Sequence, residues 1–578
     1  MRNLLKLRSG FFLFFYEWAH QSGSSKLSRR FGVAALLVGL IGAPASLLAQ
    51  AGGGELTGIV TDSTGAAIVQ ARVTATEIDT GLSVGALTTS TGDYSFLYLK
   101  PGRYKVRVSA KSFKEPVGKD VQVEAGRRVR LDLALKVGAD AEVVLVSASD
   151  AHLQSVSSDV ESTIHGEQIP AMPLNGRNFV QLTTFAPGVA LPQGTQLPRI
   201  NGGRPRTNEY LFDGISALQP EPGQVAFFPI VDDIQEFSVE TNAVPAEFGR
   251  FNGGVINLTT KGGTEQFHGS LYEFVRNEDI NARNYFASTT ARKPKFRRNQ
   301  YGGTMGGPIV RKHLFYFGDF QGQRQDVGVV RTSTVPTEAE RNGIFTGVAH
   351  IYDPATTTYT GGTYLRTEFP DDAINTALDP VAVQLLSRYP LPTRAGAANN
   401  YTRVGEDLDH QSQFDLRVDG KFGRSDLGFV RYSYFGDVDQ PATPLPDGSG
   451  AISGNVLGTN NVTGLANVLG QQLVANEMHI FGSRMLNDLR FGYTRRSNHI
   501  AGIVLDGTPS SVLGIPGIPT NAAFNNALPL FTLTGMQQIG NSSGTLSNYQ
   551  TAVMQLVDIF SRTAGSHTLK FGSDLRWY

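Results

Sequence analysis

Apolar and polar side chains alternate along much of the second half of the chain. Between Gln413 and Phe422 one side of an extended strand is apolar and the other is charged, with Phe414, Leu416, Val418 and Phe422 against Asp415, Arg417, Asp419 and Lys421. The alternation recurs at residues 489–494 and 569–577. Strands of about ten residues with one apolar and one polar face are typical of a transmembrane β-barrel. The pattern therefore predicts about nine barrel strands within residues 265–578.

The links between these predicted strands alternate in length. Short links are expected at residues 308–312, 423–425, 486–488 and 564–566, with a turn over 306–310, and long links at 325–410, 436–472 and 500–550. A barrel with short turns at one rim and long loops at the other has this arrangement. A soluble β-sandwich also alternates, but it does not explain why the long links fall at every second position. The acidic residues Asp371, Asp372, Asp437 and Asp439 are expected in the long loops as solvated groups, with calcium binding as the alternative.

Residues 55–137 contain about seven short predicted strands, separated by turn signals such as Thr64-Gly65 and Pro101-Gly102. This regular spacing predicts a β-sandwich. A basic segment at residues 26–30, an apolar run over residues 31–48 and the sequence Ala49-Gln50-Ala51 precede it, so we interpret residues 1–51 as a signal peptide with a long n-region. A single membrane anchor is the alternative, although a run of about 18 residues is near the lower limit for spanning a bilayer.

Residues 169–264 show a third pattern, in which short apolar strands alternate with glycine-rich and charged turns. The most distinctive positions are Asn201, Gly202, Gly203, Arg204, Asp213, Gly214, Gly249, Asn252, Gly253 and Gly254. The Asn-Gly-Gly sequences permit positive φ and tight turns. Charges of both signs are dispersed through the segment, as Arg199, Arg204, Arg206 and Arg250 against Asp213, Asp232, Asp233 and Glu247. Such charges would hold a domain inside a polar lumen through hydrogen bonds rather than through an apolar interface. For any single one of these residues, an ordinary solvated loop charge is the alternative, and none is assigned to a ligand.

Together with residues 173–179 and 185–189, these motifs resemble the plug domain of TonB-dependent outer-membrane receptors, in the order that the family has. Residues 58–62, 92–96 and 101–104 are similar to a carboxypeptidase-regulatory-like domain, as in the Oar-like group. The resemblance implies a mainly β protein with an N-terminal β-sandwich, an α/β plug domain and the first part of a 22-stranded-type transmembrane β-barrel. It also implies a place in the bacterial outer membrane, with the N-terminal domain in the periplasm.

Residues 138–168 are expected to be a linker that contains an extended apolar segment, namely Glu142, Val143, Val144, Leu145 and Val146. An extended segment of this kind can pair edge-on with a strand of a partner. By the resemblance it is a TonB box, which receives force from a TonB-type energy-transducing protein. The alternatives are a last strand of the sandwich and a plain linker.

The function that the resemblance implies is plug-gated import of an unidentified ligand across the outer membrane, in contact with outer-membrane lipid. The first alternative is an Oar-like surface adhesion or secretion-linked barrel without active import. The second is a soluble carbohydrate-binding protein of several domains. The amino-acid composition of the loops does not indicate which ligand is bound.

Charge and motif content exclude several other functions. Lys+Arg and Asp+Glu both number 51, so no nucleic-acid footprint is present. Cysteine is absent, which excludes disulfides and thiolate metal sites. Residues 540–544 match G-x-S-x-G, but they lie in a Gly/Ser/Asn-rich loop instead of between a strand and a helix. We therefore predict no enzyme activity, no cofactor and no metal.

The predicted strand count conflicts with the predicted plug. A plug of about a hundred residues needs the wide lumen of the 22-stranded class, which about nine strands do not enclose. An open sheet would also expose unpaired backbone groups to lipid. We therefore expect the sequence to be a fragment that lacks more than half of its barrel.

Overall fold

The computed structural model describes residues 53–111, 113, 119–135, 160–192, 195–220, 223–283, 293–423, 425–450, 464–482, 484–501, 517, 528–540, 547–564 and 567–578. The expected signal peptide, the expected TonB box (Glu142 to Val146) and residues 541–544 of the G-x-S-x-G match lie outside them. Within the described residues, no helix has the length and apolar character needed to cross a bilayer. The chain is mainly β, as predicted.

The N-terminal sandwich (residues 53–135) consists of two four-stranded sheets. One sheet has the order β4 (Asp93–Leu99), β1 (Gly54–Asp62), β7 (Arg128–Arg130), with β8 (Leu133–Leu135) also paired to β1; the other has the order β3 (Ser83–Leu87), β2 (Arg72–Glu77), β5 (Gly102–Ser109), β6 (Lys119–Val123). Alternate residues of β5, including Val106 and Val108, pack with Leu56 of β1 in one apolar core. The sequence pattern does not predict β6 and β7, because both are short and rich in charge.

The central unit (residues 160–264) is built on a five-stranded sheet of order β13-β12-β15-β14-β9. Its strands are β9 (Val160–His165), β12 (Glu209–Phe212), β13 (Ile215–Ser216), β14 (Ile234–Asn242) and β15 (Val255–Thr260), beside a small pair, β10 (Val189–Ala190) and β11 (Arg199–Ile200). Strand β9 lies within the segment expected to be a linker; it pairs antiparallel with β14, so the linker prediction is wrong for this part.

The helical segments of the central unit are short 3-10 turns: η1 (Ile169–Ala171), η2 (Phe179–Phe185) and η3 (Val231–Asp233). Segment η2 begins at Asn178, whose side chain accepts a hydrogen bond from the backbone nitrogen of Val180 (2.9 Å). Phe179 then packs edge-on against Phe212 of β12 and Phe237 of β14, with ring centroids 6.4 Å and 5.8 Å apart. These aromatic contacts anchor the helical turns on one face of the sheet.

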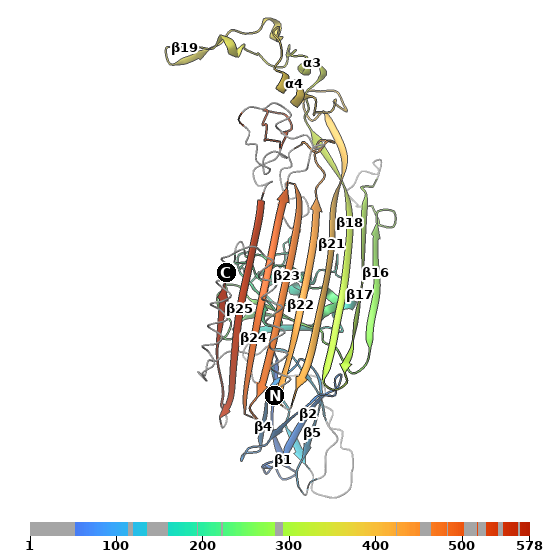
Figure 1. Cartoon of the computed structure of the whole chain (residues 1–578), viewed down its shortest axis with the longest axis vertical. Helices are drawn as coiled ribbons and strands as arrows, with labels where there is room; N and C mark the ends of the chain where they lie inside the picture. Colours follow the sequence, from blue (N-terminus) through green and yellow to red (C-terminus); the bar gives the residue numbers. More distant parts are fainter. Residues whose placement is uncertain are drawn as a thin grey trace, which may run out of the picture. The chain divides into compact units, whose positions relative to one another are not determined.

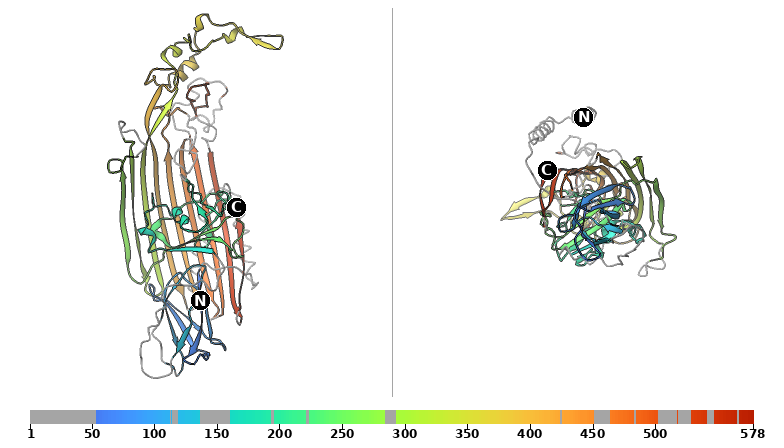
Figure 2. Two further views of the ribbon diagram at one scale, coloured as in Figure 1. Left: turned by 180° about the vertical axis from the view of Figure 1, so that it is seen from behind. Right: turned by 90° about the horizontal axis from the view of Figure 1, so that it is seen from below.

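Nine antiparallel strands form a further sheet, which we call the wall. In chain order these are β16 (His268–Asn277), β17 (Phe296–Val310), β18 (Leu314–Ser333), β21 (Tyr401–Phe422), β22 (Asp426–Gln440), β23 (Leu465–Ile480), β24 (Met485–Ala501), β25 (Ser547–Ala564) and β26 (His567–Trp577). Each strand pairs with its neighbours in sequence (Figure 1). Figure 2 shows that the sheet is curved across its width. This up-and-down order is the one expected of a membrane β-barrel.

The wall is polar on the face that meets the central unit and apolar on the other. Phe414 and Leu416 of β21 are 39% and 49% exposed, whereas Asp415 and Arg417 are 3% and 4% exposed. A soluble sheet packed on a hydrophobic core would bury its apolar face instead. The alternation therefore has the direction expected of a strand between lipid and a polar interior.

Several wall strands are longer than their side-chain pattern predicts. The turn expected at residues 306–310 is wrong, because these residues continue β17 and the chain turns at 311–313. The link expected at 486–488 is also wrong, because these residues belong to β24, which begins at Met485 after β23 ends at Ile480. Strand β18 likewise extends to Ser333 and β21 begins at Tyr401, inside the long link expected there. Backbone hydrogen bonds between strands continue where the side-chain alternation is interrupted.

The segment between β18 and β21, which we call the 334–400 loop, has secondary structure of its own (Figure 1). Its elements are α3 (Glu338–Arg341), η4 (Pro354–Thr356), β19 (Thr358–Thr360), β20 (Thr363–Leu365), η5 (Pro370–Asp372) and α4 (Pro380–Leu386). Asp371 and Asp372 lie in this loop, as predicted. The same prediction is wrong for Asp437 and Asp439, which lie in β22 and are buried. Their alternation with Val438 places both on the inward face of that strand.

Candidate functional site

The central unit meets the polar face of the wall at the turn between β12 and β13. Asp213 and Gly214 form this turn with φ of 51° and 79°, a region that glycine adopts freely and aspartate tolerates. Thr260 donates hydrogen bonds from its backbone nitrogen to Asp213 Oδ1 (3.0 Å) and from its hydroxyl to Asp213 Oδ2 (2.8 Å). These two bonds hold the carboxylate in one orientation toward the wall.

Two arginines of the wall bind this carboxylate. Arg417 of β21 and Arg431 of β22 are register partners, so their side chains leave the same face of the sheet. Arg417 Nη1 donates to Asp213 Oδ1 (3.0 Å), and Arg431 Nε donates to Asp213 Oδ2 (2.7 Å). All three side chains are at most 5% exposed. We call Asp213, Arg417 and Arg431 the arginine clasp.

The arginine clasp strongly favours the ionised form of its aspartate. Burial by itself would raise the pKa of Asp213, but Arg417, Arg431 and the hydrogen bonds from Thr260 lower it to about 2. Asp213 is therefore a carboxylate at neutral pH. It supplies the negative charge that two arginines directly opposite each other require.

The clasp continues into a longer series of polar contacts. Arg417 Nη2 lies 2.9 Å from Asp419 Oδ1, and Lys100 of the sandwich lies 3.3 Å from the same oxygen. On the other side, Arg431 Nη2 donates to Gln472 Oε1 (2.7 Å). Sandwich, wall and central unit are thus connected by hydrogen bonds and ion pairs between named side chains.

Two glycines allow the wall and the central unit to approach closely. A Cβ atom at Gly214 would lie 1.7 Å from Arg490 Nη1 of β24. A Cβ atom at Gly492 of β24 would lie 2.3 Å from Ile215 Cγ2 of β13. Because real Cβ contacts are never this short, a larger residue at either position would displace the facing side chain.

The predicted motif positions Asn201 to Arg204 make hydrogen bonds that stabilise turns within the central unit itself. Asn201 (φ 49°) donates from Nδ2 to the carbonyl of Thr241 (2.6 Å), and Gly202 follows with φ of 74°. Gly203 donates its backbone N–H to the carbonyl of Ile200 (2.9 Å). The carbonyl of Arg204 accepts a hydrogen bond from the hydroxyl of Thr207 (2.7 Å). These contacts lie within the central unit, so we interpret the Asn201 to Arg204 motif as structural.

The second Asn-Gly-Gly motif contains glycine for a reason other than the positive φ that was expected. Gly253 and Gly254 are not among the described residues with positive φ. Instead, a Cβ atom at Gly254 would lie 2.3 Å from the carbonyl oxygen of Glu240, and one at Gly253 would lie 2.0 Å from Asn208 Oδ1. Asn252 donates its N–H to the carbonyl of Thr207 (3.3 Å). Close packing of strands, and not turn conformation, requires these glycines, while Gly249 has no atom within 4 Å of a Cβ built on it.

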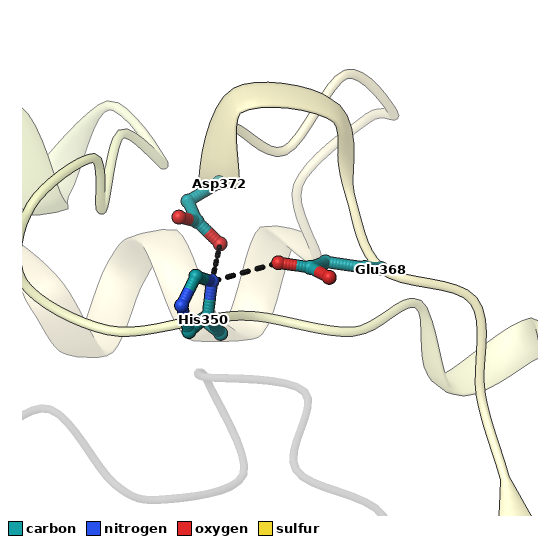
Figure 3. Close-up of side chains that lie close together, drawn as sticks. All are labelled: His350, Glu368 and Asp372. Atoms are coloured by element: carbon teal, nitrogen blue, oxygen red, sulfur yellow. Dashed lines mark ion pairs between the residues drawn. The ribbon is translucent and has the colours of Figure 1, made fainter.

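A separate group of polar residues lies in the 334–400 loop. His350 Nδ1 is 2.7 Å from Glu368 Oε1 and 3.3 Å from Asp372 Oδ1 (Figure 3). Asp372 and Glu368 together raise the pKa of His350. Asp372 Oδ1 also accepts a hydrogen bond from the backbone nitrogen of Ile351 (3.2 Å). The group therefore ties two distant parts of the loop together.

Arg417 and Arg431 are both absent from the predicted site, although the sequence contains a signal for them. The link at 423–425 joins β21 to β22, and a hairpin closed by so short a link has a defined register. Counting outward from Phe422 and Asp426 places Arg417 opposite Arg431. Two arginines facing each other on an inward surface indicate an anion between them.

Comparison with known proteins agrees with this architecture. Residues 259–578, more than half of the chain, match the family described as outer membrane beta barrel domain, and residues 55–136 match the carboxypeptidase regulatory-like domain. The TonB-dependent transporter Oar of Myxococcus xanthus is 27% identical over 264 residues, which are 43% of this chain and 24% of that protein. The chain thus matches only about a quarter of that relative's length.

Solved structures of outer-membrane proteins are also similar at low identity. The ferric enterobactin receptor PfeA of Pseudomonas aeruginosa has 14% identity and a TM-score of 0.37, over 70% of this chain and 46% of that one. The transporter YddB of Escherichia coli has 14% identity and a TM-score of 0.33, over 70% and 54%. The assignment rests on the family match over residues 259–578. The chain belongs to the outer membrane beta barrel domain family, and the protein is located in the outer membrane.

Proposed function

We propose that the chain acts as a TonB-dependent receptor, in which the central unit is the plug and the arginine clasp holds it against the barrel wall. The observation that carries the proposal is Asp213 bound between Arg417 and Arg431. An interface made of charged contacts specifies one docked position. Breaking one such buried pair costs about 3–5 kcal/mol, which an applied force can supply locally without unfolding the whole protein.

The order of segments along the chain supports a way for that force to reach the central unit. Residues 142–146, the proposed TonB box, precede β9 in sequence. Strand β9 is an edge strand of the central sheet and pairs only with β14 among the described strands. Tension on the chain before Val160 would therefore act first on the edge of this sheet, on the hydrogen bonds that join β9 to β14. The partner is a TonB-type energy-transducing protein.

The different lengths of the connections at the two rims of the wall support an orientation of the protein in the outer membrane. Few residues separate β17 from β18, β21 from β22 and β23 from β24, and the short connections of outer-membrane barrels face the periplasm. The sandwich contacts the same rim, where Lys421 Nζ donates to the carbonyl of Ser83 (3.2 Å). The sandwich then lies in the periplasm, and the 334–400 loop lies outside the cell, where it meets an unidentified ligand. We assign no covalent chemistry to the protein, since its named relative is a transporter.

Site-specific cross-linking tests this proposal without knowledge of the ligand. The chain contains no cysteine, so Val144→Cys introduces one thiol that can form a disulfide with a cysteine in the C-terminal domain of a TonB protein. Val69→Cys, at an exposed position of the sandwich, is the matched control. We expect a cross-link in cells at residue 144 and none at residue 69. Equal cross-linking at both, or none at either, would contradict the proposal and favour a surface adhesion role.

A further inference from the structure

A second pair of like charges lies beside the arginine clasp. Asp319 of β18 and Asp415 of β21 are register partners and are 7% and 3% exposed. The backbone nitrogen of Asp415 donates to Asp319 Oδ1 (2.9 Å), which holds the two strands at this point. Like charges directly opposite each other destabilise a sheet unless a third group compensates them.

The central unit presents another carboxylate to this pair. Asp233, at the end of η3, is 1% exposed, and its backbone carbonyl accepts a hydrogen bond from Lys261 N (2.7 Å). One carboxylate oxygen from each of Asp233, Asp319 and Asp415 lies within 4.8 Å of the other two. At the clasp the central unit brings the opposite charge to the wall; here it brings the same charge.

Most oxygens of this group have no hydrogen-bond partner among the described residues. Asp233 Oδ2, Asp319 Oδ2 and both carboxylate oxygens of Asp415 are buried without one. The nearest cation is Arg431, whose Nη1 lies 3.7 Å from Asp415 Oδ1, an ion pair that is longer than a hydrogen bond. Buried ionised carboxylates without partners are strongly disfavoured, so the group must either hold protons or bind a further cation.

Carboxylates outnumber cations in this neighbourhood. The carboxylates are Glu77, Asp213, Asp233, Asp319, Asp415 and Asp419, and the cations are Arg417, Arg431 and Lys100. Asp232, next in sequence to Asp233, is already paired with Arg177. A divalent cation among the three aspartates would reduce this excess of negative charge.

We propose that Asp233, Asp319 and Asp415 form a binding site for a hard divalent cation, Ca²⁺ or Mg²⁺, that joins the central unit to the wall. We call this group the aspartate site. Carboxylate oxygens are the ligands that these ions prefer. Oxygens bound to one Ca²⁺ at about 2.3–2.6 Å lie no more than about 5 Å apart, which the spacing of the aspartate site satisfies. The site is a second connection between central unit and wall, and it does not depend on import.

Cation binding and unfolding of the whole chain, folded in lipopolysaccharide-free detergent, test this proposal. We expect calorimetric titration with CaCl2 or MgCl2 to show binding, and EDTA to lower the midpoint of thermal unfolding reversibly. Asp233→Asn and Asp415→Asn should each weaken binding by at least about tenfold, because each removes a charged ligand. Asp79→Asn, an exposed control in the sandwich, should bind as the unaltered chain does.

If the aspartate site binds a cation, adding the cation should reverse the order of stability of Asp233→Asn and the unaltered chain. A merely structural role of Asp233 predicts no such reversal. In EDTA, Asp233→Asn should be at least as stable as the unaltered chain, because it relieves repulsion among three carboxylates. With Ca²⁺ or Mg²⁺ in excess, the unaltered chain should be the more stable of the two. The proposal would be overturned by an absence of binding, or by binding that is unchanged in both variants. It would also be overturned if Asp233→Asn were less stable than the unaltered chain in EDTA as well as in Ca²⁺. Asp319→Asn provides a third variant if either of the others does not fold.

Discussion

Arg417 and Arg431 lie directly opposite each other on β21 and β22, and the carboxylate of Asp213 joins their guanidinium groups. Asp419 and Asp415 of the wall each lie beside one of these arginines, whereas Asp213 of the central unit contacts both and offsets the repulsion between them. The central unit in turn orients Asp213 through two hydrogen bonds from Thr260. Each part thus supplies what the other needs, and this accounts for a precise docked position between two polar surfaces.

Replacing Asp213 by asparagine should destabilise the folded chain severely. The change keeps the shape of the side chain but removes the charge that both buried arginines share, which leaves Arg417 with Asp419 and Arg431 with the more distant Asp415. The loss of one partner from such a buried group costs about 3–5 kcal/mol. Denaturant unfolding of the detergent-folded chain measures this loss. Asp79→Asn removes an exposed ion pair with Arg103 and should cost at most about 1 kcal/mol. Equal losses in the two variants would contradict a central role for the clasp.

The clasp should also make the protein sensitive to acid. The pKa of Asp213 is lowered to about 2 in the folded chain, against about 3.9 for an unfolded aspartate. Its stabilisation is therefore complete above about pH 4 and is lost as the pH falls toward 2. Near-ultraviolet circular dichroism during urea unfolding at a series of acidic pH values measures the slope. Asp213→Asn should show a smaller slope over the same interval; an unchanged slope would assign the sensitivity to other groups.

The two glycines of the predicted motifs should respond differently to alanine. A Cβ atom at Gly254 would meet the backbone carbonyl of Glu240, so Gly254→Ala should cost about 1–3 kcal/mol through overpacking between β15 and β14. Gly249 has open space around it, and Gly249→Ala should change the free energy of unfolding by no more than about 0.5 kcal/mol. Urea unfolding of both variants checks the difference. A similar cost at both positions would mean that turn flexibility, and not close packing, selects these glycines.

The 334–400 loop should loosen as the solution becomes alkaline. Asp372 and Glu368 raise the pKa of His350 above its usual value of 6.5, so its ion pairs are fully present below that value and are lost as the pH rises through the raised one. Hydrogen exchange of residues 350–372 at about pH 6 and about pH 9, corrected for intrinsic rates, measures the effect. His350→Gln should remove the difference between the two conditions. Persistence of the difference in this variant would assign it to another group.

Local features of the chain determined much of the wall. The alternation from Phe414 to Phe422 indicated which side chains face lipid, because in an extended strand every second residue lies on the same face. The short link at 423–425 determined that Arg417 and Arg431 face each other, since a tight hairpin allows few registers. Strand ends were predicted less well, as residues 306–310 and 486–488 illustrate, because backbone pairing does not stop where side-chain alternation does.

Only the tertiary structure decided which charges meet. Asp319 and Asp415 become opposite through β18 and β21, whose pairing spans the whole 334–400 loop, and a link of that length sets no register. Asp213 and Asp233 reach the wall from a separate sheet, so nothing in their neighbouring residues indicates that one meets arginines and the other aspartates. Side-chain periodicity is a property of a few consecutive residues, whereas electrostatic pairing depends on distances in space between residues that are far apart in the sequence.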